Sequence, residues 1–129
     1  MTKFLAKKTI VNGIKFDSKK ESLRYKELLL LQKKGIITDL KLQPRYTLQE
    51  SFKKNGKTYR KIEYVADFAY YDKELKKEVI EDVKSDFTEK DKVFKLKQKL
   101  FEYKYQDKTI KVYKWILKKL KNIVTRLKI

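Results

Sequence analysis

The stretch of residues 64–84 constrains the fold most, because it has the pattern of two strands joined by a polar turn. The segment before the turn is apolar except for Asp67, and the segment after it carries Asp82 and Lys84 beside valine and isoleucine residues. Successive side chains alternate between the two faces of a sheet, so Asp82 and Lys84 share one face. Pairing of the two strands brings Asp67 to the same patch. The pattern therefore predicts two carboxylates and one ammonium group close together on a sheet.

This patch has a structural and a functional interpretation. In the structural interpretation, Asp82 and Lys84 form a salt bridge at a sheet edge, or both face solvent. Either arrangement avoids burying an uncompensated charge, which is costly. In the functional one, Asp67 and Asp82 bind Mg²⁺ and the main-chain carbonyl of Val83 adds a ligand, while Mn²⁺ is an open alternative. Lys84 then positions the attacking water or offsets charge on a phosphate. Glu81 points to the opposite face of an ideal strand, and only a bulge would bring it into the ligand set.

The absence of histidine and cysteine narrows the possible chemistry. It excludes Ser-His-Asp hydrolases, zinc sites built on imidazole or thiolate, and disulfide bonds, and it fits an intracellular location. Catalysis must therefore use carboxylates, lysine, tyrosine, hydroxyl groups or a metal ion with oxygen ligands.

The charge of the chain predicts an anionic partner. Lys and Arg number 35 against 17 Asp and Glu, which gives a net charge of +18 at pH 7. Nucleic acid is the commonest partner of such a domain, although a lysine-rich proteome is an alternative explanation of the charge. No run is long and apolar enough for a signal peptide or a membrane helix, so we expect a cytoplasmic protein with no membrane partner.

Turn and cap signals predict one α+β domain over residues 1–129, with helices flanking a central mixed sheet. Ser18 and Glu21 have capping-box spacing, and Gly35 ends the helix that follows them. Two Asn-Gly pairs suit hairpin turns. A second helix has Thr88 as its predicted N-cap. The expected strands are 9–11, 14–16, 36–42, 45–52, 59–71, 78–84 and 109–113, and the expected helices are 18–35, one beginning near residue 88, and a basic amphipathic helix over 114–129.

Five segments in a fixed order carry a resemblance to a known family. They are Phe16-Asp-Ser-Lys-Lys-Glu21, Gln43-Pro44, Tyr64-Val-Ala-Asp67-Phe, Glu81-Asp82-Val-Lys84 and Lys97-Gln-Lys99-Leu-Phe. Together they resemble a small family of phage-borne nucleases of the PD-(D/E)XK type, long carried as a domain of unknown function and similar to Holliday junction resolvases and restriction-like endonucleases. Ala66 stands where the motif has proline, and Asp82 where glutamate is more usual; both are common variations.

The resemblance implies a restriction-endonuclease-like sheet flanked by helices. It implies that Asp67 is the first motif carboxylate, Asp82 the acidic position of the second motif and Lys84 its lysine. It also offers Glu21 as a helix-borne residue that orients a metal-bound water or binds a second ion. Capping of the first helix is an equally good explanation of Glu21.

Three further residues are candidates for contact with nucleic acid. Gln43 would line the site, although Gln-Pro is equally a turn signal. Lys95 and Lys99 lie one helical turn apart and would reach a phosphate, unless they are simply solvated.

These observations predict a Mg²⁺-dependent DNA endonuclease, selective for branched or junction DNA and acting in phage replication or recombination within a bacterial host cell. Cutting both strands of a junction needs two sites, so we expect a homodimer. The alternative is a noncatalytic DNA- or RNA-binding module whose carboxylates are structural.

Overall fold

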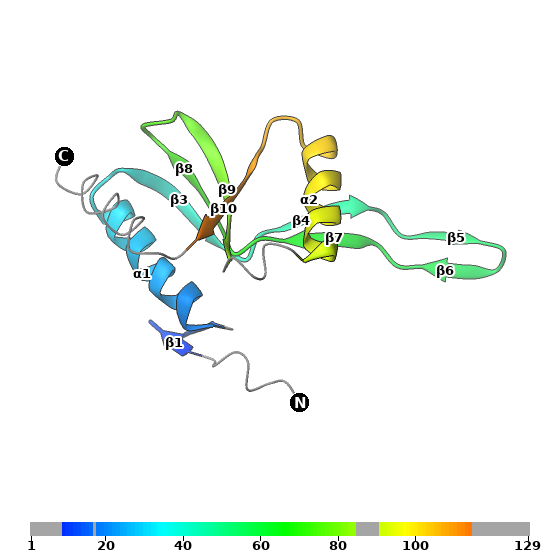
Figure 1. Ribbon diagram of the computed structural model, residues 1–129, viewed down its shortest axis with the longest axis horizontal. Helices are drawn as coiled ribbons and strands as arrows, with labels where there is room; N and C mark the ends of the chain where they lie inside the picture. Colours follow the sequence, from blue (N-terminus) through cyan, green and yellow to red (C-terminus); the bar gives the residue numbers. More distant parts are fainter. Residues whose placement is uncertain (1–8, 17, 85–90, 115–129) are drawn as a thin grey trace.

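The computed structural model describes residues 9–16, 18–84 and 91–114 of the chain. It shows an α+β fold in which a four-stranded mixed sheet carries a helix on each side (Figure 1). The α+β class and the mixed sheet predicted from the sequence are thus confirmed. Neither helix in the described ranges has the length and the apolar character needed to cross a bilayer.

The elements follow one another as predicted in broad order, with more and shorter strands than expected. The helices are α1 (Lys19–Lys33) and α2 (Lys92–Lys104). The strands are β1 (Thr9–Val11), β2 (Ile14–Phe16), β3 (Ile37–Leu42), β4 (Arg45–Gln49), β5 (Phe52–Lys54), β6 (Lys57–Tyr59), β7 (Ile62–Val65), β8 (Phe68–Asp72), β9 (Lys77–Lys84) and β10 (Ile110–Lys114). Lys114 ends a strand instead of beginning a helix, and the rest of the predicted helix over 114–129 lies outside the described residues.

The central sheet has the strand order β10-β9-β8-β3. Strand β9 pairs antiparallel with β8 and parallel with β10, so it lies inside the sheet. Five consecutive residues of β9, 79–83, are buried, which explains its valine and isoleucine content. The two acidic residues within this run must therefore find partners inside the protein.

Helix α1 covers one face of the sheet. Ser18 caps it, because its hydroxyl accepts a hydrogen bond of 3.2 Å from the Glu21 amide. The helix ends before Gly35, whose φ of 80° favours glycine. Leu28 and Leu31 are fully buried and belong to the core formed with the aromatic side chains of β8. Both predicted ends of this helix are confirmed.

A buried ion pair ties α1 to the sheet. Arg24 donates two hydrogen bonds to Glu81, at 2.6 and 2.9 Å, and both side chains are almost wholly buried. The hydroxyl of Tyr70 also donates to Glu81, at 2.7 Å. Arg24 further pairs with Glu27 at 3.0 Å and stacks on the ring of Tyr113. These contacts make Glu81 a structural residue on the face covered by α1.

Helix α2 covers the other face, together with β4 and β7. Phe94 and Phe101 of α2 are buried against Tyr64 of β7. Asp91 caps the helix by accepting a hydrogen bond of 2.9 Å from the Val93 amide. The predicted N-cap, Thr88, lies outside the described residues.

The predicted continuous strands 45–52 and 59–71 are each broken in the structure. The important break separates β7, which pairs with β4, from β8, which pairs with β3 and β9. Pro44 lacks an amide hydrogen and Gln43 has a φ of 49°, so the neighbouring strand breaks at the same level. Two hydrogen bonds cross the break, from the Gln43 amide to the Asp67 carbonyl at 2.9 Å and from the Ala66 amide to the Pro44 carbonyl at 3.1 Å.

Beyond this break the chain forms a ribbon that leaves the body of the protein. The β4–β7 pair continues into the two-stranded hairpin of β5 and β6, which points away from the sheet (Figure 1). We call residues 51–61, which contain this hairpin, the arm.

We expect Arg24→Met to lower the free energy of unfolding by about 3–5 kcal/mol, because it leaves the Glu81 carboxylate buried without its cation. The matched control is Arg45→Met, whose guanidinium is exposed and pairs with Glu63 at 3.1 Å. This control should cost less than about 1 kcal/mol. Urea unfolding followed by circular dichroism measures both, and equal losses would contradict the structural role of Arg24.

Candidate active site

The structure brings Asp67 and Asp82 together at the break between β7 and β8. The Asp67 amide donates to the Glu81 carbonyl at 3.1 Å, and Asp67 Oδ2 accepts from the Val83 amide at 2.7 Å. Asp67 therefore makes hydrogen bonds to the residues directly before and directly after Asp82 in β9. These two bonds fix its carboxylate at the end of the β8–β9 pairing.

Tyr64 holds the second carboxylate. Its hydroxyl donates a hydrogen bond to Asp82 Oδ2, and both residues are 3% exposed. Tyr64 was not predicted from the sequence to be a site residue. The signal was present, because a tyrosine in an apolar strand must find a partner for its hydroxyl when it is buried.

The two carboxylates resist being charged together. Burial raises the pKa of Asp67, and together with the negative charges of Asp82 and Glu21 it brings this pKa to about 8. Burial also raises the pKa of Asp82, against the lowering effects of the Tyr64 hydrogen bond and the Lys84 charge. A cation between the carboxylates would relieve this repulsion.

Lys84 lies on the same side of the sheet as Asp82, as predicted. Its charge lowers the pKa of Asp82, and its Nζ lies 4.5 Å from the centre of the Phe94 ring on α2. The side chain is only partly buried. An ammonium group in this position can neutralise negative charge beside Asp82.

Glu21 contributes to the site electrostatically from the first turn of α1. Its amide binds the Ser18 cap, while its carboxylate lies near enough to raise the pKa of Asp67. This hydrogen bond involves the main chain of Glu21, so the capping role and the site-directed role of its side chain both stay predictions. Gln43 lies at the rim, with its amide bonded to the Asp67 carbonyl and its side chain exposed.

The other candidates are divided between the site and the surface. The Val83 amide is bonded to Asp67, and a metal contact from the Val83 carbonyl stays a prediction. Lys95 and Lys99 are exposed on α2. Glu81 is engaged by Arg24 on the opposite face, which agrees with its predicted orientation.

The donor set suits a hard cation that keeps several water ligands. Each aspartate uses Oδ2 in the bonds described above, and an ionised carboxylate accepts about four hydrogen bonds or metal contacts, so acceptor capacity is left. Among the described residues, no group of three or more acidic side chains is placed so that it could hold a metal ion. Two carboxylates with water and substrate oxygens are the usual protein contribution to Mg²⁺ binding.

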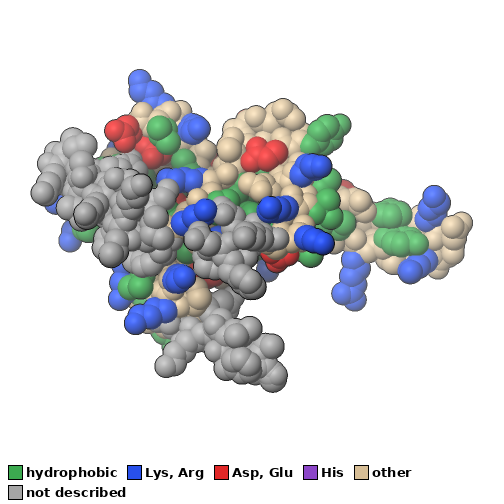
Figure 2. Space-filling model, viewed as in Figure 1, with side chains coloured by type: hydrophobic (Ala, Val, Ile, Leu, Met, Phe, Trp, Pro, Cys, Tyr) green, Lys and Arg blue, Asp and Glu red, His purple; other side chains and the backbone are tan. Residues whose placement is uncertain are grey.

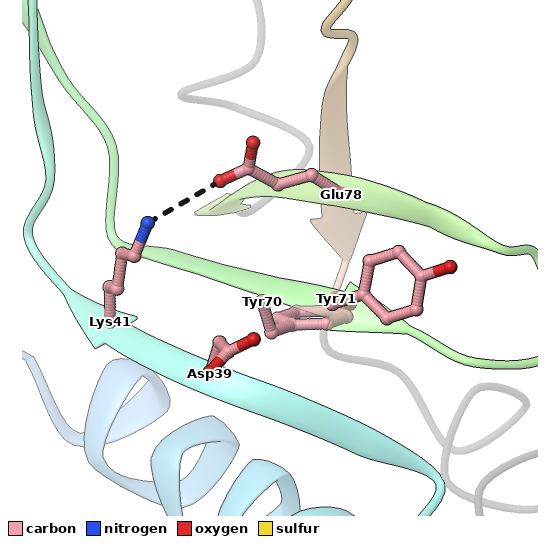
Figure 3. Close-up of a pocket in the computed structure, with 5 residues that line it drawn as sticks. All are labelled: Asp39, Lys41, Tyr70, Tyr71 and Glu78. Carbon is pink, nitrogen blue, oxygen red and sulfur yellow. Dashed lines mark ion pairs between the residues drawn. The ribbon is translucent and has the colours of Figure 1, made fainter.

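A separate pocket lies near the turn end of the β8–β9 hairpin. Figure 3 shows its lining residues, with Lys41 and Glu78 joined by an ion pair of 3.8 Å. Lys108 also pairs with Glu78, at 3.1 Å. Because Glu78, one of the two acidic side chains of this pocket, is already paired with two lysines, the pocket is a weaker metal site than the Asp67–Asp82 pair.

Comparison with known proteins gives a family and no assigned activity. No curated protein and no solved structure matches the chain. Residues 1–123 match the model of a family described as "Protein of unknown function (DUF1064)". Since the match covers most of the sequence, the chain belongs to the DUF1064 family.

Proposed function

We propose that this protein is a metal-dependent DNA endonuclease whose site is formed by Asp67, Asp82 and Lys84. The observation that carries the proposal is the pair of mutually repelling, largely buried carboxylates with a lysine beside them. Burial and the charge of Asp82 raise the pKa of Asp67. A site of this kind gains more from a bound cation than from any role in packing.

The residues of the chain have distinct roles in the proposed reaction. Asp67 and Asp82 would hold Mg²⁺ or Mn²⁺. Such an ion would polarise the scissile phosphate and make a bound water molecule more acidic. The Val83 amide and the Tyr64 hydroxyl orient the two carboxylates, each through one Oδ2 atom. Lys84 offsets the charge that develops on the scissile phosphate or positions the attacking water. Glu21 adds negative charge that favours the bound cation.

Charge and resemblance support DNA as the substrate. The net charge of +18 favours a polyanion, and lysine and arginine side chains are spread over the body and the arm (Figure 2). The resemblance to phage-borne PD-(D/E)XK nucleases supports branched or junction DNA, a homodimer and a role in phage recombination in the cytoplasm of a bacterial host. Lys95 and Lys99 are exposed and basic, as phosphate contacts must be.

A noncatalytic nucleic-acid-binding module is the second candidate. It is favoured by the hydrogen bonds that both carboxylates accept within the protein. In this alternative the two aspartates stabilise the break between β7 and β8, and the basic surface alone provides the function.

Asp82→Asn should reduce Mg²⁺-dependent cleavage of branched DNA by about 100-fold or more, because an amide replaces a charged ligand. Binding of the same DNA in EDTA should be retained. Both are measured on branched, single-stranded and linear duplex substrates. The control is Asp72→Asn, because Asp72 is also buried and accepts hydrogen bonds from two turn amides, at 2.9 and 3.1 Å. Cleavage of no substrate by the wild-type protein would favour the noncatalytic module.

Asp67→Asn should stabilise the metal-free protein increasingly as pH rises from about 4 to about 8. Since the pKa of Asp67 is raised to about 8 in the folded protein, the folded state keeps a proton over this range that the unfolded state releases. Wild-type stability therefore falls with pH, by at most about 1.4 kcal/mol per pH unit, and the variant lacks this loss. Urea unfolding in EDTA at several pH values measures the difference.

Adding Mg²⁺ at pH 8 should restore stability to the wild-type protein and leave Asp67→Asn unchanged. If the two proteins have the same pH dependence in EDTA, Asp67 does not carry the buried proton and this account of the site fails.

A further inference from the structure

We propose that the arm, residues 51–61, binds a groove of duplex DNA at a distance from the candidate active site. Every residue of the arm is exposed. An isolated two-stranded hairpin is marginally stable in water, and this one adds no side chain to either core. The arm therefore adds little to the stability of the domain. Its protruding position leaves it accessible to a partner (Figure 1).

The charge of the arm is of one sign. Five of its eleven residues are basic and none is acidic; the basic residues are Lys53, Lys54, Lys57, Arg60 and Lys61. Lys54 and Lys57 lie directly opposite each other in the β5–β6 pairing, where like charges destabilise a hairpin. Lys61, at the base, pairs with Glu63 at 3.2 Å. A polyanion bound between Lys54 and Lys57 would remove the repulsion between their charges.

The turn between β8 and β9 provides a comparison within the same chain. It also carries three exposed lysines, Lys73, Lys76 and Lys77. They alternate with acidic residues of the same turn, Asp72, Glu74 and Glu78. The lysine-rich composition of the chain therefore does not explain why the arm has no acidic residue. The uniform positive charge is a local feature of the arm.

An aromatic pair lies on the same face of the arm as the opposed lysines. Phe52 and Tyr59 are paired in register, and their rings stack with centres 4.7 Å apart and planes 8° apart. Both are about two-fifths exposed, and Lys57 Nζ lies 5.1 Å from the Tyr59 ring centre. Strand alternation places Lys54 and Lys57 on this face. Cations for phosphates beside a flat aromatic surface for sugars and bases favour nucleic acid over a protein partner.

The dimensions fit one DNA segment that contacts both the arm and the candidate site. A two-stranded ribbon enters a major groove about 12 Å wide. From Ala66, beside the site, to Gly56 at the tip the chain runs ten residues through β7 and β6, which span about 33 Å when extended at 3.3 Å per residue. This length is close to one turn of B-DNA, about 34 Å. If the proposed endonuclease function holds, the arm contacts the duplex about one turn from the scissile phosphate.

The test compares two triple variants of equal charge. One is Lys53→Gln/Lys54→Gln/Lys57→Gln in the arm, and the control is Lys73→Gln/Lys76→Gln/Lys77→Gln in the β8–β9 turn. Binding to a labelled duplex of about four helical turns is measured in EDTA over a range of salt concentrations. The arm variant should lower the slope of log affinity against log salt by about 2–3 and shorten the footprint on one side by about one turn. The control should change neither.

The outcomes separate the arm from the catalytic proposal, because EDTA prevents metal-dependent cleavage. Equal loss of binding in both triple variants, or no loss in the arm variant, overturns the role of the arm. A change of oligomeric state in the arm variant with unchanged DNA binding also overturns it and indicates a second copy as the partner. Arm-dependent binding by a wild-type protein that cleaves no DNA with Mg²⁺ supports the arm and overturns the endonuclease. Removing the Lys54–Lys57 repulsion should not lower the melting temperature, which circular dichroism checks.

Discussion

The rest of the structure depends on how Asp67 is bound to β9. Its amide and its carboxylate each make a hydrogen bond to the main chain of that strand, on either side of Asp82. These two bonds end the pairing of β8 with β9 at the point where the chain turns out of the sheet. The same break directs β7 toward β4 and the arm, so one local feature both creates the carboxylate pair and gives the molecule its protruding ribbon.

The alternation of side chains along β9 then separates support from chemistry. Glu81 faces α1, where a guanidinium and a phenol compensate its charge. Asp82 faces α2, where a phenol, a lysine and a second carboxylate surround it. The first arrangement neutralises a buried charge completely. The second leaves negative charge that Lys84 offsets only in part, and this is the physical difference between a structural ion pair and the proposed site for a cation.

Strong local signals made part of this structure predictable from the sequence. The Ser18 cap and Gly35 define α1, and strand alternation places Asp82 and Lys84 on one face. The strand break, the Asp91 cap and the role of Tyr64 were not predicted. An apolar segment has the same sequence pattern whether it forms one strand or two. The partner of a buried hydroxyl group is determined by tertiary packing. The hairpin turn at Asn55-Gly56 was predicted and is confirmed, but the protrusion of the arm was not predicted, because it depends on how the rest of the chain folds.

The most direct test of the central claim is the anomalous scattering of Mn²⁺ in crystals of the wild-type protein. The proposed site predicts a metal ion about 2.0–2.3 Å from an oxygen of Asp67 and from an oxygen of Asp82, with water completing its coordination. If Mn²⁺ binds elsewhere, or if the two carboxylates keep a shared proton with no metal between them at saturating Mn²⁺, the claim is contradicted.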